Sequence, residues 1–223
     1  MRYSSPRIKI CCIQSLAEAR MAITYGASAL GLVSSMPSGP GVIPEHLIAE
    51  ITSALPPAVS SFLLTSYHDP KKIIAQQIRC GANTIQLCDY PDLGAYRKLR
   101  DQLRGISLVQ VIHVIGEEAL DKAQIVADHV DAILLDSGRP SQSVKELGGT
   151  GRTHDWSVSR RIRETVAVPV FLAGGLTPAN VADAIRAVQP YGVDVCTGVR
   201  TDGQLDEVKL TAFINAVRNA PGS

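Results

Sequence analysis

The chain has 223 residues, with 22 basic and 21 acidic side chains and a formal net charge of +1. A protein so close to neutral has no general attraction for nucleic acid or an acidic membrane surface, so any bound anion must be held locally. The length is near the roughly 250 residues of one barrel domain. We therefore expect a single domain over residues 1–223 that binds a small molecule, with no nucleic-acid or membrane partner.

The sequence shows no run of the ~20 apolar residues that a membrane span needs, and its first residues lack the apolar stretch of a secretory signal. We expect a cytoplasmic protein. The five cysteines are odd in number and follow no paired metal-ligand spacing, which predicts reduced thiols with neither a disulfide nor a zinc site; they are Cys11, Cys12, Cys80, Cys88 and Cys196. The scattered histidines are interpreted as surface or loop residues rather than a metal set; they are His46, His68, His113, His129 and His154.

Short β-branched runs alternate along the chain with helix-length amphipathic segments, a pattern typical of a parallel sheet. Eight such strand and helix units in so few residues favour a closed (β/α)8 barrel over a doubly wound open sheet, which would alternate in the same way. The strands are predicted near residues 7–12, 28–33, 59–65, 83–88, 107–114, 131–135, 169–172 and 192–195.

The helices between these strands carry recognisable end signals. Helices are predicted from Leu16 to Tyr25 and from Pro70 to Cys80, each closed by a following glycine. The pair Thr177-Pro178 is predicted to open another helix, with proline in its first turn. A last helix, from about Glu207 to Asn219, would close the ring.

In a barrel of this type the chemistry belongs on the loops that follow the strands. Gly174-Gly175 follows the seventh predicted strand, and Thr197-Gly198 follows the eighth. Glycines there let backbone amides approach a phosphate, and the Thr197 hydroxyl could donate a further hydrogen bond. Tight turns that need positive φ are the alternative interpretation. The segment 148–153 resembles a nucleotide P-loop but lacks its first glycine and its lysine.

Two side chains are candidates for acid and base. Strand alternation places Lys9 and Cys11 inside the barrel, with Ile8, Ile10 and Cys12 on the helix side. An ammonium group beside Cys11 would lower the thiol pKa and supply a thiolate, although a strand cysteine is also often a small buried apolar residue.

Asp136 directly follows the sixth predicted strand, at the mouth of the barrel. Apolar walls there would raise its pKa and suit it to act as a general acid. A capping role for this carboxylate in the following loop is the alternative.

Several motifs, in matching order over nearly the whole chain, resemble phosphoribosylanthranilate isomerase of tryptophan biosynthesis; they are residues 9–13, 86–87, 134–137, 148–156, 172–178 and 198–199. The resemblance implies a cofactor-free Amadori rearrangement of N-(5-phosphoribosyl)anthranilate. By that analogy Asp136 protonates the ring oxygen and Cys11 takes a proton from C2′. The phosphate would lie on the amides around Gly174, Gly175, Thr197 and Gly198, and Gln86 would contact the substrate.

The chain also departs from the family pattern. Cys12 stands where the family usually has glycine, and Gln14 where it has threonine. Pro40 falls where an arginine is expected to hold the anthranilate carboxylate, a contact that Arg139 or Arg200 would have to replace. Further departures are Cys88-Asp89 in place of His-Gly, and Cys196-Thr197-Gly198-Val199-Arg200 in place of Ser-Ser-Gly-Val-Glu.

Three hypotheses remain open. The protein is the isomerase itself, with its carboxylate contact relocated, or a related isomerase or lyase that acts on another phosphorylated sugar, or a non-catalytic barrel that binds a phosphorylated metabolite. Only the two enzymes need Cys11 and Asp136. For all three we expect a phosphorylated small molecule as partner, no cofactor or metal, and a monomer or homodimer.

Overall fold

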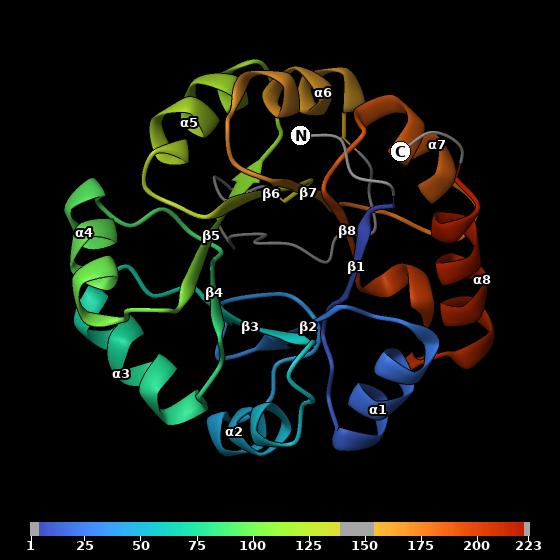
Figure 1. Ribbon diagram of the computed structural model, residues 1–223, viewed down its shortest axis with the longest axis horizontal. Helices are drawn as coiled ribbons and strands as arrows, with labels where there is room; N and C mark the ends of the chain where they lie inside the picture. The colour runs from blue at the N-terminus through green and yellow to red at the C-terminus, as the bar shows by residue number, and fades with distance from the viewer. Residues whose placement is uncertain (1–4, 139–153, 221–223) are drawn as a thin grey trace.

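A computed structural model describes residues 5–138 and 154–220. Eight parallel strands form a closed barrel in sequence order, because β1 pairs with both β2 and β8. Figure 1 shows the helices as an outer ring around these strands. The strands are β1 (Arg7–Ile10), β2 (Ala29–Val33), β3 (Ser60–Thr65), β4 (Thr84–Leu87), β5 (Ser107–His113), β6 (Ala132–Asp136), β7 (Val170–Leu172) and β8 (Gly192–Val195).

Each strand is followed by a helix, and the loop after β8 adds a short 3-10 turn and a two-stranded hairpin. The helices are α1 (Leu16–Tyr25), α2 (Glu45–Ser53), α3 (Pro70–Cys80), α4 (Leu93–Gln102), α5 (Glu118–Ala127), α6 (Trp156–Thr165), α7 (Val181–Val188) and α8 (Glu207–Arg218). The added elements are η1 (Thr197–Val199), β9 (Arg200–Thr201) and β10 (Gln204–Leu205). The predicted (β/α)8 barrel is confirmed.

All eight predicted strands are present, with ends within about two residues of the expected ones. Helices α1 and α3 have the predicted bounds, and each ends at a glycine with positive φ. The helix predicted to open at Thr177-Pro178 instead begins at Val181, so that prediction was wrong. The reason is that the Asn180 side chain accepts a hydrogen bond from the Thr177 amide at 2.8 Å and closes a separate turn ahead of the helix.

The barrel has two apolar layers, one between sheet and helices and one inside the strands. As predicted, Ile8 and Ile10 belong to the outer layer, whereas Lys9 lies inside, with its Nζ 5.2 Å from the centre of the Phe62 ring. Cys12 was predicted on the outer face, but it packs in the inner layer with Cys11. Strand β1 ends at Ile10, so strict alternation no longer applies at Cys12.

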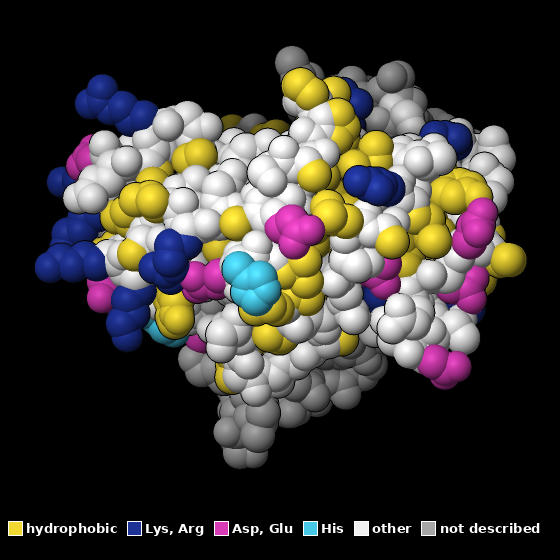
Figure 2. Space-filling view, turned by 90° about the horizontal axis from the view of Figure 1, so that it is seen from below, with side chains coloured by type: hydrophobic (Ala, Val, Ile, Leu, Met, Phe, Trp, Pro, Cys, Tyr) yellow, Lys and Arg dark blue, Asp and Glu magenta, His cyan; other side chains and the backbone are white. Residues whose placement is uncertain are grey.

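The surface carries charge of both signs. On the face in Figure 2, Lys and Arg side chains stand among Asp and Glu side chains, with small apolar areas between them. Within residues 5–138 and 154–220, no helix combines the length and the apolar character needed to cross a membrane.

Candidate active site

A pocket opens at the carboxyl ends of the strands, where barrels of this type hold their active sites. The loops after β1, β2, β4, β7 and β8 contribute to its wall, together with residues at the end of β6. The site residues predicted from sequence that line it are Cys11, Gln86, Asp136, Gly174, Gly175 and Thr197. Residues from distant parts of the chain are thus brought to one cavity.

Cys11 follows β1 directly, and its amide donates to the Val195 carbonyl at 2.8 Å. The thiol is buried, and burial raises its pKa to about 11. The Lys9 ammonium opposes this rise, but it is bonded to the Asp194 carboxylate at 2.8 Å, and that negative charge raises the Cys11 pKa again. The prediction that Lys9 gives a low thiol pKa was therefore wrong, because burial and Asp194 outweigh the ammonium.

Asp194 is a site residue that sequence reasoning missed. It lies on β8, pairs with Lys9 inside the barrel and lines the pocket. The alternation Val193-Asp194-Val195, with flanking apolar residues on the helix side, is the signal that could have found it.

Asp136 ends β6 and is buried in the pocket wall. Burial raises the pKa of its carboxyl to about 6, although a hydrogen bond from the Ser137 amide at 2.7 Å opposes the rise. The predicted upward shift is confirmed. A carboxyl with a pKa near 6 is protonated often enough at neutral pH to donate a proton.

The two glycine turns lie against each other. Gly174 and Gly175 have φ values of +84° and +62°, so the turn interpretation holds at both positions. A Cβ on Gly198 would lie 2.0 Å from the Leu176 carbonyl oxygen, so only glycine allows this approach between the two loops. Turns after β7 and β8 therefore form adjoining parts of the pocket wall.

Arg200 does not take the place of the missing arginine. Its Nη1 and Nη2 atoms each contact a carboxylate oxygen of Glu18 at 2.9 Å, and Nη2 also donates to the Cys12 carbonyl. Arg200 is buried in this pairing, so its prediction as a substrate contact was wrong. Arg139 and the 148–153 segment lie outside the described residues. Pro40 lines the pocket, as its position in the second loop predicted.

Gln86 extends from β4 into the pocket wall. Its Oε1 atom is buried and has no hydrogen-bond partner among the described residues. Its Nε2 atom lies 3.8 Å from the Cys88 sulfur. The amide oxygen is thus available to a ligand, and its contact with substrate stays a prediction.

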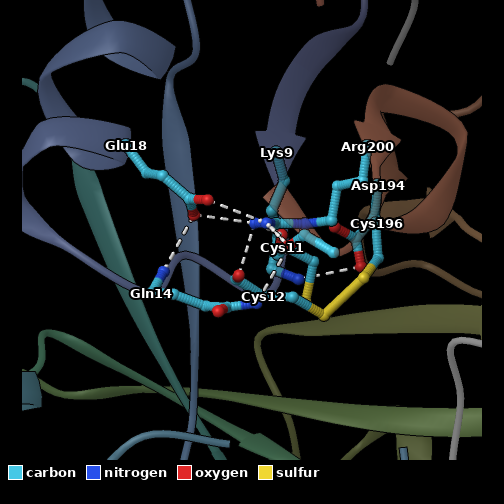
Figure 3. The surroundings of a disulfide bond; sticks show 9 residues. Lys9, Cys11, Cys12, Gln14, Glu18, Asp194, Cys196 and Arg200 are labelled. Carbon is cyan, nitrogen blue, oxygen red and sulfur yellow. Dashed lines mark hydrogen bonds and ion pairs between the residues drawn. A yellow bond between two sulfur atoms is a disulfide. The ribbon is translucent and has the colours of Figure 1, made fainter. Parts of the chain in front are cut away.

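The structure contains a disulfide between Cys12 and Cys196, so the prediction that all five cysteines are reduced was wrong (Figure 3). Sequence spacing hid the pair, because 184 positions separate residues that barrel closure brings to a Cα–Cα distance of 5.9 Å. Cys11, Cys80 and Cys88 are free thiols.

His113, at the end of β5, is buried and so differs from the expected surface or loop position, whereas His154 lies in the loop before α6, as expected. The His154 Nε2 atom lies 2.6 Å from the Ser159 hydroxyl, and burial lowers the ring pKa to about 4. In the part of the chain that the structure describes, no three His, Cys, Asp or Glu side chains come together as a metal-binding group.

Known proteins resemble this chain over most of its length. The family described as N-(5'phosphoribosyl)anthranilate (PRA) isomerase matches residues 8–216. N-(5'-phosphoribosyl)anthranilate isomerase 2 of Methanosarcina mazei is 36% identical over 215 residues, which cover 96% of this chain and 94% of the relative. The isomerase of Haloferax volcanii is 37% identical, over 97% of this chain and 95% of its own length.

Solved structures agree with these relatives. The phosphoribosyl anthranilate isomerase of Thermotoga maritima superposes with a TM-score of 0.83 at 30% identity, over 96% of this chain and 98% of that protein. A phosphoribosyl anthranilate isomerase in complex with reduced 1-(o-carboxyphenylamino)-1-deoxyribulose 5-phosphate gives a TM-score of 0.80 at 28% identity, over 96% and 98% of the two chains. This chain therefore belongs to the N-(5'-phosphoribosyl)anthranilate isomerase family.

Proposed function

We propose that the protein catalyses the Amadori rearrangement of N-(5-phosphoribosyl)anthranilate to 1-(2-carboxyphenylamino)-1-deoxyribulose 5-phosphate, with Asp136 as acid and Cys11 as base. The observation that carries the proposal is that both side chains line one pocket together with the two glycine turns. Family membership supports the same reaction. The pocket is the site in which aldose carbon, ring oxygen and phosphate would all be held.

Asp136 begins the reaction by donating its proton to the furanose ring oxygen. The C1′–O bond then breaks, and the nitrogen lone pair forms an iminium ion. A pKa of about 6 suits this role, because the carboxyl is neither permanently charged nor too weak an acid. The Ser137 amide hydrogen bond holds one carboxylate oxygen in place during the transfer.

Cys11 completes the reaction by removing the proton from C2′. The electrons of that C–H bond form an enolamine, which tautomerises to the ketone. Only the thiolate form of Cys11 can accept this proton, so the thiol first loses its own proton to solvent. Burial raises the pKa of the thiol to about 11, but the positive iminium formed in the first step favours a nearby thiolate, as does the buried Lys9 ammonium. Proton donation by Asp136 thus creates the positive charge that favours the Cys11 thiolate in the second step.

The phosphate end of the substrate would lie on the amides of Gly174, Gly175 and Gly198, with the Thr197 hydroxyl beside them. Three of these residues, Gly174, Gly175 and Thr197, line the pocket. Close packing of the two turns, fixed by the approach of Gly198 to Leu176, supports a preformed anion cradle.

A second candidate function follows from the part of the pocket wall that would contact the aromatic group of the substrate. None of the described residues that line it is Lys or Arg, and Pro40 occupies the loop where the family has arginine. A phosphorylated aminosugar whose aromatic or alkyl group lacks a carboxylate would fit such a wall. Relative turnover of phosphoribosylanthranilate and phosphoribosylaniline distinguishes the two substrates.

The test of the proposed reaction is loss of phosphoribosylanthranilate fluorescence with the purified protein and with its Cys11→Ala variant. We expect turnover by the wild type, and loss of turnover in the variant with the affinity for ribose 5-phosphate retained. Turnover that survives in Cys11→Ala would reject the base. Ribose 5-phosphate binding without turnover of either substrate would favour a non-catalytic barrel.

We also propose a cytoplasmic location and a monomeric or homodimeric state. Membership in a biosynthetic enzyme family supports the location. The T. maritima isomerase, described as dimeric, supports the second of the two states. Sedimentation of the purified protein distinguishes them.

A further inference from the structure

We propose that the Cys12–Cys196 disulfide positions the base and the phosphate turn, so that full activity of this chain requires the oxidised pair. This inference rests on the proposed function and adds a control of the same site. Cys12 and Cys196 are positioning residues here, because each acts through the residue next to it in the chain.

The crosslink joins the two segments that matter most to the reaction. Cys12 directly follows the proposed base, Cys11, and Cys196 directly precedes Thr197 of the proposed phosphate turn. Both cysteines line the pocket. Figure 3 shows the sulfur bridge running from the end of β1 to the loop after β8, beside Cys11. A change at the bridge is therefore transmitted through one peptide unit to each site.

The disulfide restrains an unfavourable backbone conformation at Cys12. Its φ is +62°, a conformation that glycine adopts freely and that is strained for a residue with a Cβ. The family usually has glycine at this position. A covalent bond to Cys196 opposes relaxation of Cys12 toward negative φ, which would rotate the adjoining Cys11 peptide.

The loop after β2 packs against Cys12. A Cβ placed on Gly41 would lie 2.4 Å from the Cys12 Cβ, so the loop that contains Pro40 packs directly on the crosslink. The disulfide thus lies where the loops after β1, β2 and β8 meet. In that order, these loops carry the proposed base Cys11, the Pro40 side of the pocket wall and Thr197 of the proposed phosphate turn.

Arg200 also holds the backbone at Cys11 and Cys12 in place. Its Nη2 atom donates to the carbonyls of Cys11 and Cys12 while the guanidinium pairs with Glu18 (Figure 3). These contacts fix both peptide planes beside the base. The Arg200 contacts involve no sulfur atom, so we expect reduction of the disulfide to loosen the site rather than unfold the protein.

The exchange reaction balances with thiol reagents. Oxidised glutathione forms the bridge when the Cys12 thiolate displaces one glutathione and the Cys196 thiolate then displaces the second; the two glutathione thiolates take up the protons that the protein thiols lose. A dithiol such as dithiothreitol reverses the reaction, and it is oxidised to its own cyclic disulfide while the two protein thiols take up the protons.

The experiment compares protein prepared with oxidised glutathione and the same protein after dithiothreitol and its removal. Alkylation in denaturant, followed by mass spectrometry, should modify only Cys11, Cys80 and Cys88 in the first sample and all five cysteines in the second. Reduction should lower kcat/KM on the order of tenfold, because small displacements of reacting groups cost large rate factors. The affinity for ribose 5-phosphate should fall with it.

Two variants separate positioning from stability. The double variant Cys12→Gly with Cys196→Ser restores the family residues, and its kcat/KM should not respond to dithiothreitol. Cys80→Ser, a buried free thiol on α3, is the matched control and should keep the full response.

Several results would overturn the proposal. One is alkylation of all five cysteines in the protein prepared with oxidised glutathione. Another is a lower melting temperature after reduction while kcat, KM and the affinity for ribose 5-phosphate stay unchanged. If neither sample turns over substrate, the proposed function fails, and the change in ribose 5-phosphate affinity alone decides the role of the bridge. Failure of the oxidised protein to bind ribose 5-phosphate would reject both.

Discussion

Replacement of Asp136 by Asn should make the protein more stable at neutral pH, although it removes the proposed acid. Burial raises the pKa of this carboxyl from 3.8 to about 6, so the folded protein holds the proton more tightly than the unfolded chain does. The stabilising contribution of that proton is complete below pH 3.8 and is lost as the pH rises through about 6. A rise of about two pKa units corresponds to about 3 kcal/mol at pH 7.

Asn suits this test because its side-chain oxygen can still accept the Ser137 amide hydrogen bond, which is 2.7 Å long in the wild type. The free energy of unfolding in urea should be measured for both proteins between pH 4 and pH 8. We expect the difference to be small near pH 4 and to grow to about 3 kcal/mol in favour of Asn at pH 7.

The control is Asp101→Asn, which removes one exposed carboxylate from α4. A difference for Asp136→Asn that is constant with pH, or that favours the wild type at pH 7, would refute the raised pKa. Such a gain in stability with loss of turnover is the expected cost of a buried acid kept for catalysis.

Two further substitutions test the frame around the site. Gly198→Ala brings a Cβ within 2.0 Å of the Leu176 carbonyl oxygen and should weaken ribose 5-phosphate binding about tenfold. In the control Gly94→Ala the added Cβ meets no atom within 4 Å, so the affinity should not change. Equal affinities of Gly198→Ala and the wild type, measured by calorimetry, would contradict the close approach. Arg200→Met leaves the Glu18 carboxylate buried without its cation and should destabilise the fold by about 3–5 kcal/mol in urea. Adding Glu18→Gln should recover part of that loss, and a loss below about 1 kcal/mol for Arg200→Met would show the pair to be dispensable.

The barrel could be predicted because its signals are local. Glycines at residues 26 and 81 end α1 and α3, and apolar runs of strand length alternate with amphipathic segments throughout. The start of α7 could not be predicted in the same way. There the Asn180 side chain accepts a hydrogen bond from the Thr177 amide and closes a turn before the helix begins. Pro178, the signal for a helix start, does not reveal that bond.

The candidate site was predictable to the extent that strand ends determine it. Cys11 and Asp136 follow or end barrel strands, and parallel strands bring their carboxyl ends to one mouth. The charge balance at Cys11 was not predictable, since it depends on burial and on Asp194, which is 183 positions away along the chain. A pairwise view of Lys9 and Cys11 gave the wrong sign because it omitted both.

The departures from the family pattern acquire a common explanation only in three dimensions. Each of three residues departs from a family motif when taken alone, but in the fold they meet with Glu18 at the end of β1. They are Cys12, Cys196 and Arg200. Cys12 introduces a strained backbone, and the disulfide and the Arg200 hydrogen bond both restrain it. Loss of either support would leave the other to hold a conformation that only glycine adopts freely. We therefore expect residues 12 and 196 to change together: a return to glycine at residue 12 removes the need for the second cysteine, whereas the buried Glu18 carboxylate still requires Arg200.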